Sequence, residues 1–297
     1  MSMEKKRRKP EKTTETGFTQ RISKEYYNLT AAEKKAADYV VAHRAEAQNL
    51  SITELAAASD VAEATISRFV RRLKYKGYNE FRLDIARSVT ASSSGLSPLS
   101  GEVTDEDSFS EIIRKIYTAD VDAMTQTLEL IDERKIKQAA DMIEQADKVF
   151  CMGQGGSMII AQEAAHLFTT TQSKYFAVTD NHTQAITAST MTERDAVLYF
   201  SYSGATTDMM HTLSIVRNRG AGVILITRFP NAPGAKLADV VLQCGSNESP
   251  LQLGSVAARI SQMYLLDVLF SEVCLRNLDD CRQARMAIAE ALTDKHL

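Results

Sequence analysis

The stretches Gly153-Gln154-Gly155-Gly156-Ser157 and Ser201-Tyr202-Ser203-Gly204-Ala205-Thr206 each lie between an apolar, strand-like run and a helix-like run. A turn from strand to helix directs unpaired backbone N–H groups and the positive end of the helix dipole at one point, where glycines let an anion come close. Serine and threonine hydroxyls add hydrogen bonds. Two such loops predict a single phosphate-bearing ligand held between them.

The groups expected to bind the phosphate are neutral, because neither loop contains Arg or Lys. They are the hydroxyls of Ser157, Ser201, Ser203 and Thr206, and the backbone N–H groups of Gly155, Gly156, Gly204 and Ala205. The alternative, that the hydroxyls only cap helices, stays open. Two residues beyond the ends of other strand-like runs are further candidates for contact with the same ligand, His182 and Glu248.

The dinucleotide fingerprint G-x-G-x-x-G is the main competing interpretation of the first loop. Met158 occupies its sixth position, and Lys174 and Tyr175 stand where the ribose-binding acidic residue is expected. A Walker A loop is also disfavoured, since no Gly-Lys-Ser/Thr follows the strand. We therefore expect a simple phosphate site and no cofactor.

Strand-like and helix-like runs alternate through the second half of the chain. The strand-like runs lie at 148–152, 175–178, 196–201, 223–227 and 239–243, and helices are expected at 109–131, 133–146 and 253–274. This alternation predicts an α/β domain with a five-stranded parallel sheet, helices on both faces and ligands at the carboxyl ends of the strands.

The helix at 253–274 is expected to pack the domain rather than to bind the ligand. Its predicted buried stripe consists of Val256, Ile260, Tyr264 and Val268. On this interpretation Arg259 and Asp267 form an ion pair at the packing surface.

The length of 297 residues is enough for two domains, and 44% hydrophobic and 25% charged residues are typical of a globular protein. No apolar run reaches the ~18 residues of a membrane span, and the basic start lacks the apolar core of a signal peptide. We therefore expect a cytoplasmic protein without membrane contact. No C-x-x-C spacing occurs, so buried thiols are expected, rather than a metal site, at Cys151, Cys244, Cys274 and Cys281.

Charge is unevenly distributed along the chain. Residues 1–90 contain 18 Lys and Arg against 12 Asp and Glu, and residues 91–297 contain 17 against 26. The first part is therefore basic and the second acidic, although the whole chain has a net charge of only −3. A basic domain suits a polyanion, because each neutralised phosphate releases counterions.

Three helices are expected in the basic part, at 29–43, 51–58 and 62–74. Thr30 with Glu33, and Ser51 with Glu54, form capping boxes at the starts of the first two. The third has apolar residues at i, i+3, i+4 and i+7, which predict a core face of Ile66, Phe69, Val70 and Leu73.

The second and third helices, joined by a tight turn, fit a helix-turn-helix whose last helix enters the major groove of DNA. Its other face carries hydroxyls and arginines, which is typical of DNA contact. We assign base edges to Ala64, Thr65 and Ser67, and phosphates to Arg68, Arg71, Arg72, Lys74 and Lys76. The alternative is a plain helical bundle with a solvated, charged face.

Three segments of this region resemble the amino-terminal domain of the RpiR family of bacterial transcriptional regulators. They are Ser51-Ile-Thr-Glu-Leu-Ala, Val61-Ala-Glu-Ala-Thr-Ile-Ser-Arg-Phe and Tyr75-Lys-Gly-Tyr-Asn-Glu-Phe81. In that family a sugar isomerase (SIS) domain follows, and the two Ser/Gly loops resemble its phosphosugar site. The resemblance extends from about Leu29 to Val273, and it implies a DNA-binding regulator that senses a phosphosugar, often with a histidine where His182 stands.

Two positions depart from the pattern of that family, and both concern helix ends. Ala62 stands where Ser is usual, so the last helix of the motif lacks a side-chain cap. Lys74 stands where Gly is common.

The expected domains are a basic disordered tail at 1–17, a helix-turn-helix domain at 18–90, a Ser/Gly/Pro-rich linker at 91–108 and a SIS domain at 109–297. We expect a transcriptional regulator, a homodimer or homotetramer on a double-stranded DNA operator, in which a phosphosugar effector changes the spacing of paired recognition helices. The alternative is a phosphosugar isomerase or lyase with an unrelated helical head. Its base would be one of Glu163, His166, His182 and Glu248.

Overall fold

The computed structural model describes residues 17–92, 103, 106–246 and 255–293. The chain divides into two compact units, Met1–Ser94 and Gly95–Leu297. The tail predicted at 1–17 lies outside the described residues except for Gly17, and so does most of the linker predicted at 91–108. The predicted domain limits therefore stay predictions.

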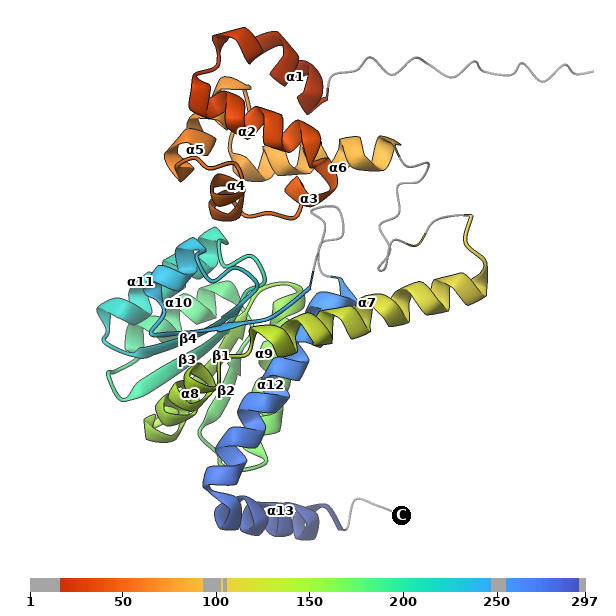
Figure 1. Ribbon diagram of the computed structural model, residues 1–297. Helices are drawn as coiled ribbons and strands as arrows, with labels where there is room; N and C mark the ends of the chain where they lie inside the picture. Colours follow the sequence, from red (N-terminus) through yellow and green to blue (C-terminus); the bar gives the residue numbers. More distant parts are fainter. Residues whose placement is uncertain (1–16, 93–102, 104–105, 247–254, 294–297) are drawn as a thin grey trace, which may run out of the picture. The chain divides into compact units, whose positions relative to one another are not determined.

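The described part of the amino-terminal unit is helical (Figure 1). Its elements are α1 (Phe18–Glu25), the 3-10 helix η1 (Tyr26–Asn28), α2 (Ala31–Ala42), α3 (Arg44–Ala47), α4 (Ile52–Ala58), α5 (Glu63–Arg72) and α6 (Tyr78–Ser92). Phe81 of α6 lies at the centre of the core, with its ring centroid 5.6 Å from that of Phe69 and 5.3 Å from that of Tyr75. One apolar core therefore holds these helices together.

The expected helix starts are confirmed in this unit. Thr30 and Glu33 form the capping box of α2, and Ser51 and Glu54 form that of α4. Helix α5 begins after Ala62, which has no side-chain cap. The predicted core face of α5 is buried throughout, at Ile66, Phe69, Val70 and Leu73.

The carboxyl-terminal unit is built on a five-stranded parallel sheet of strand order β2-β1-β3-β4-β5. The strands are β1 (Lys148–Gly153), β2 (Tyr175–Val178), β3 (Asp195–Phe200), β4 (Gly222–Thr227) and β5 (Val240–Gln243). The helices are α7 (Phe109–Leu130), α8 (Glu133–Gln145), α9 (Gly156–Thr169), α10 (Asn181–Thr190), α11 (Thr207–Asn218), the 3-10 helix η3 (Pro233–Leu237), α12 (Val256–Arg276) and α13 (Leu278–Thr293). The predicted fold class is thus confirmed.

Helices cover both faces of this sheet, as predicted (Figure 1). Alternate strand residues point to opposite faces. Cys151, Leu198 and Phe200 pack with α8, α9 and α12, whereas Met152 and Val197 pack with α10 and α11. Both faces of the sheet are therefore shielded from solvent, which explains why the strand sequences are almost entirely apolar.

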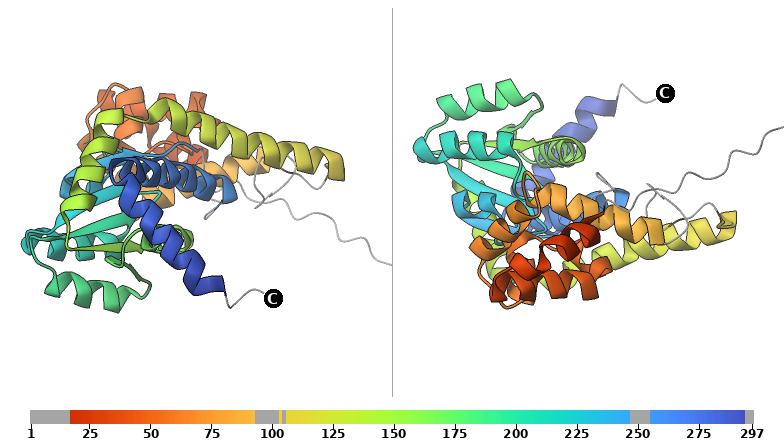
Figure 2. Two further views of the ribbon diagram at one scale, coloured as in Figure 1. Left: turned by 90° about the horizontal axis from the view of Figure 1, so that it is seen from below. Right: turned by 90° about the horizontal axis from the view of Figure 1, so that it is seen from above.

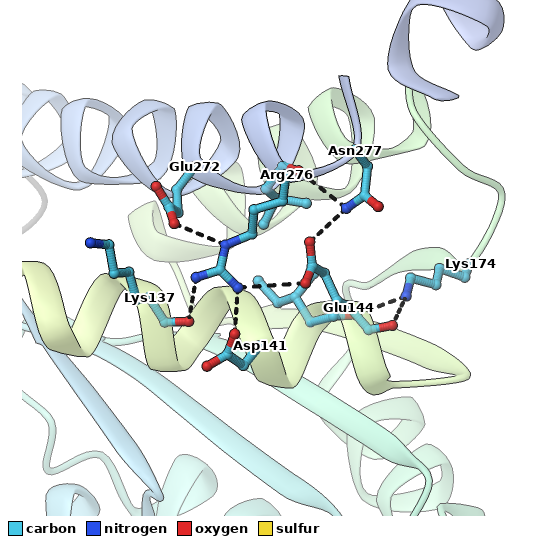
Figure 3. A network of polar contacts seen from close by, with 9 residues as sticks. Lys137, Asp141, Glu144, Lys174, Glu272, Arg276 and Asn277 are labelled. Carbon is cyan, nitrogen blue, oxygen red and sulfur yellow. Dashed lines mark hydrogen bonds and ion pairs between the residues drawn. The ribbon is translucent and has the colours of Figure 1, made fainter. Parts of the chain in front are cut away.

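Helices α7 and α12 pack against each other, and the amino-terminal part of α7 extends beyond the sheet in all three views (Figures 1 and 2). The other end of α12 is held to α8 by Arg276, whose guanidinium pairs with Asp141 of α8 (Figure 3). The same guanidinium also pairs, at 2.8 Å, with Glu272 of its own helix. Beside it, the amide of Asn277 donates to Glu144 at 2.6 Å. These contacts fix the direction of α12 across the sheet.

Among the described residues, no helix is long and apolar enough to cross a membrane. Cys151, Cys244 and Cys281 are buried, and Cys274 is half-buried. Burial raises the pKa of the Cys151 thiol to about 12, which keeps it protonated.

Candidate functional sites

Helices α4 and α5 form the predicted helix-turn-helix. The turn between them has Asp60 in the left-handed region, at φ +52°, where its carboxylate pairs with Lys35 at 2.7 Å. The hydroxyl of Thr53 on α4 donates to the carboxylate of Glu63 on α5 at 2.8 Å. The turn and this bridge set the angle at which α5 leaves α4.

One face of α5 is open to solvent. Ala64, Arg68 and Arg71 are exposed and Ser67 is half-buried, as the helical spacing predicts. Thr65 differs from the expectation, because only 6% of it is exposed and its hydroxyl accepts a hydrogen bond from Arg68 at 3.4 Å. Thr65 directly precedes Ile66 in the sequence, so it lies at the edge of the buried face of α5 and is itself buried.

Arg72 is exposed but is engaged within the domain. Its guanidinium lies 3.3 Å from the carboxylate of Glu33 and donates to the carbonyl of Asn28 at 2.9 Å. Burial alone would raise the pKa of Glu33, but hydrogen bonds from Thr30 and the charge of Arg72 lower it overall. Glu33 is only 2% exposed, so Arg72 joins α5 to α2 through a buried carboxylate.

Helix α5 ends in a Schellman motif. The N–H of Lys74 donates to the carbonyl of Arg71 at 3.0 Å, and that of Tyr75 donates to the carbonyl of Val70 at 3.2 Å. Lys74 has φ +66°, the conformation that favours glycine. This geometry explains why glycine suits the position, and it leaves the side chains of Lys74 and Lys76 exposed beside the helix end.

In the other unit, the two Ser/Gly loops follow β1 and β3, which are neighbours in the sheet. Gly153 at the end of β1 is paired in register with Phe200 at the end of β3. The strand order reverses here, because β1 leads through α9 to β2 and β3 leads through α11 to β4. Such a reversal opens a crevice at the carboxyl ends of the strands. The structure therefore brings the two loops together.

A cavity of about 200 Å³ lies at this place. The two loops contribute Gln154, Gly156, Ser157, Ser201, Tyr202, Ser203 and Thr206 to its lining, and the end of β3 contributes Tyr199 and Phe200. Five of the predicted loop residues thus line one cavity, while Gly155, Gly204 and Ala205 are not among its described lining residues.

Gly204 shapes the second loop without facing the cavity. Its N–H donates to the hydroxyl of Ser201 at 3.2 Å, and the N–H of Ala205 donates to the hydroxyl of Ser203 at 3.4 Å. These two N–H groups are therefore already engaged in the structure, unlike the expectation. Each hydroxyl that accepts such a bond still has its own proton to donate to a ligand.

The start of α12 supplies the remaining residues that line the cavity, Ser255, Ala258, Arg259 and Gln262. Sequence reasoning placed Arg259 in a packing ion pair and assigned no role to Gln262. It also expected Val256 in the buried stripe, yet Val256 is 45% exposed. The predicted stripe was wrong because the inward side of α12 carries small and polar residues in its first two turns, among them Ser261 at 0% and Gln262 at 1% exposure, and large apolar ones such as Leu265 and Leu269 only further along.

Three helices begin at this cavity. Gly156 and Ser157 belong to the first turn of α9, Thr206 is the N-cap of α11, and Ser255 is the N-cap of α12. Each helix start contributes partial positive charge, although the N–H groups of Ser157 and Ala258 already donate, to the carbonyl of Gln154 and to the hydroxyl of Ser255. Together with the guanidinium of Arg259, the arrangement is suited to an anion.

His182, Glu163 and His166, three of the four predicted acid–base residues, do not line the cavity. His182 is exposed in the first turn of α10, next to Asp180, whose carboxylate accepts from the N–H of Thr183 at 2.8 Å. It is not among the described residues that line the cavity, and neither are Glu163 and His166 of α9. Glu248 lies outside the described residues.

The fold defines a class of protein, in which a helix-turn-helix domain is followed by an α/β domain with a parallel sheet. The sequence pattern of the rpiR-family helix-turn-helix domain matches residues 16–92, and that of the SIS domain matches residues 142–272. The chain belongs to the RpiR family of transcriptional regulators.

Its curated relatives agree with this assignment, and a solved structure shares the fold. The chain is 30% identical over 253 residues to an HTH-type transcriptional regulator of Caldanaerobacter subterraneus, covering 85% of this chain and 89% of the relative. It is 29% identical over 264 residues to the regulator HexR of Pseudomonas aeruginosa, covering 89% and 91%. The structure of Vibrio vulnificus NanR complexed with ManNAc-6P is similar in fold, with a TM-score of 0.81 at 23% identity, covering 94% of this chain and 99% of that one.

Proposed function

We propose that this regulator binds a phosphorylated sugar between its two Ser/Gly loops and that binding changes its affinity for operator DNA. The observation that carries the proposal is the start of three helices at one cavity lined by serine and threonine hydroxyls and by Arg259. Helix starts and hydroxyls favour a phosphate over a neutral ligand. NanR, a protein of similar fold, is complexed with ManNAc-6P, which supports the same class of ligand.

On the DNA side, α5 is proposed as the recognition helix. Its open face combines Ala64 and Ser67, which are short enough to approach base edges, with Arg68 and Arg71 for phosphates. Lys74 and Lys76 extend this basic surface past the end of the helix. Arg72, bound to Glu33 and Asn28, and Thr65, buried beside the core, have less freedom to contact DNA.

A second copy of the chain is proposed as partner, through α7. Ile113, Tyr117, Met124 and Leu128 follow one another at spacings of four, seven and four residues, so they share one face of the helix. All four are exposed, Tyr117 to 69% and Leu128 to 60%. Such a contiguous apolar face is typical of an interface. A homodimer would supply two recognition helices for two half-sites, with the cytoplasm as the proposed location.

We propose that the chain is a sensor and not an enzyme. An isomerase requires a base within hydrogen-bond reach of the sugar carbon that loses its proton. The described residues that line the cavity include neither a carboxylate nor an imidazole. Effector binding would instead favour one arrangement of the two subunits and so alter the spacing of the recognition helices.

The test uses Ser203→Ala and calorimetry with glucose 6-phosphate, ManNAc-6P and the two unphosphorylated sugars. Losing a hydrogen bond to a charged group costs about 1.5–3 kcal/mol. We expect about 1.5 kcal/mol, roughly tenfold in Kd, because the freed N–H of Ala205 replaces part of the lost bond. Ser214→Ala, on the exposed side of α11, is the control and should bind like the wild type.

DNA binding provides the second measurement. The phosphosugar that binds should change the operator affinity of the wild type, and Ser203→Ala should need more of it while keeping the same affinity without effector. Equal affinity of the wild type for a sugar and its phosphate would refute the phosphate site. Turnover of a sugar phosphate at about 1 per second or more would favour an isomerase instead.

A further inference from the structure

Gln262 is a buried side chain whose amide nitrogen has no hydrogen-bond partner among the described residues. It lies on α12, is 1% exposed, and its Nε2 atom makes no hydrogen bond within the described part of the chain. Glutamine is rarely buried in this way, because an amide removed from water without a new partner costs free energy. An unpaired amide of this kind requires an explanation.

Gln154, which also lines the cavity, shows the same feature. Its Nε2 is also buried without a partner, and it lies in the loop between β1 and α9. Within the described residues of the carboxyl-terminal unit, three side chains have such an atom, Asp120, Gln154 and Gln262. Two of the three, Gln154 and Gln262, line the same cavity, so their unpartnered amide nitrogens belong to one site.

The position of Gln262 separates it from the helix start. Gln262 comes seven positions after the N-cap Ser255, which corresponds to about 10 Å along the axis of α12. A single phosphate group is too small to contact both ends of this span. Arg259, one turn before Gln262, lies between them. The residues at the helix starts suit the anion, and Gln262 suits another part of the ligand.

We propose that Gln262, together with Gln154, determines which phosphosugar binds, by hydrogen bonding to hydroxyl or carbonyl oxygens of the sugar. This inference rests on the proposed function. A side-chain amide is neutral and can donate two hydrogen bonds and accept others, which matches the mixed donors and acceptors of a sugar. A site with buried unpaired amides rejects ligands that lack the matching oxygens, because the amides then stay unpaired.

The test compares Gln262→Met with the wild type, using inorganic phosphate, glucose 6-phosphate, fructose 6-phosphate and ManNAc-6P as probes. Methionine keeps the length of the side chain and removes its polar atoms. We expect the affinity for the preferred sugar phosphate to fall at least tenfold, while the affinity for inorganic phosphate changes no more than twofold. Gln162→Met, at an exposed position of α9 outside the cavity, is the matched control and should leave every affinity unchanged.

Thermal unfolding without ligand separates recognition from a structural role. Because the amide nitrogen of Gln262 has no partner among the described residues of the ligand-free chain, Gln262→Met should unfold at the same temperature as the wild type or at a higher one. If Gln262 only supported the fold, Gln262→Met would unfold at a lower temperature and would bind the probes in the same order of affinity as the wild type. Gln154→Met, in a loop, provides an independent variant should Gln262→Met fail to fold.

The outcomes distinguish this inference from the proposed function. If the wild type prefers a sugar phosphate over inorganic phosphate and both variants keep the full preference, only the role of the glutamines is overturned. If the variants lose affinity for inorganic phosphate and sugar phosphates equally, the glutamines do not recognise the sugar, and the inference is again overturned. A wild type that binds no probe, or binds all of them like inorganic phosphate, overturns both.

Discussion

Replacing Gly204 by alanine tests the geometry of the loop between β3 and α11. Its φ of +59° lies in the left-handed region, where a residue other than glycine costs about 1 kcal/mol. A Cβ atom there would lie 2.7 Å from the Cβ of Ala232 and 2.9 Å from Oγ1 of Thr227. Neither neighbour can rotate away cheaply, since the Thr227 hydroxyl donates to the carbonyl of Tyr202 at 3.1 Å. Overpacking of this kind costs ~1–3 kcal/mol, for a total of about 2–4 kcal/mol.

The measurement is differential scanning calorimetry of the ligand-free, full chain. For a domain of about 150–250 residues, each kcal/mol lowers the unfolding temperature by about 2–4 °C, so Gly204→Ala should lower it by roughly 4–16 °C. Gly220→Ala is the control, because Gly220 also has positive φ, at +78°, but an added Cβ would lie no closer than 3.6 Å to its nearest neighbour, Glu193. It carries backbone strain without the clash and should cost less. An unfolding temperature for Gly204→Ala at or above that of Gly220→Ala would refute the close packing of this loop.

Three further predictions concern DNA binding and assembly. Replacing Arg68 and Arg71 by alanine should weaken DNA binding and lower the salt slope by up to about 2, and an unchanged slope would argue against α5 as the recognition helix. Lys74→Gly should raise the stability of the amino-terminal unit by about 1 kcal/mol, since it relieves a left-handed lysine, yet lower the salt slope by about 0.9; urea unfolding and titrations at several salt concentrations measure the two effects. Tyr117→Glu should turn a dimer into a monomer in sedimentation experiments, and an unchanged mass would exclude this face of α7 as the interface.

Most of the architecture could be predicted from local sequence patterns. The capping boxes at Thr30 and Ser51 and the apolar spacing of α5 locate the helix-turn-helix, because caps and periodicity are properties of neighbouring residues. Alternating apolar strands and helices likewise predict the parallel sheet. The strand ends differ from expectation by no more than one residue, as at β3, which begins at Asp195.

The phase of α12 was predicted wrongly, because the stripe was drawn from Val256 and Ile260 in its first turns. The buried side runs instead through Ala258, Ser261 and Gln262 to large apolar residues further along, Leu265, Leu266, Leu269 and Phe270. Small side chains let helices approach closely, and their burial contributes little to an apolar periodicity. The same limit concealed the role of α12 as a wall of the cavity.

The sequence by itself determined the two domains, the fold class and the two Ser/Gly loops, because each depends on residues close together in the chain. Tertiary structure alone decided what meets at the cavity. Ser255, Arg259 and Gln262 lie about a hundred residues after the first loop, and only the packing of α12 against α7, α8 and α9 brings them opposite Gln154 and Ser203. Tertiary structure also decided which predicted residues are occupied elsewhere. The core covers Thr65, and Arg72 is held by Glu33, because burial and pairing depend on segments that the local pattern does not contain.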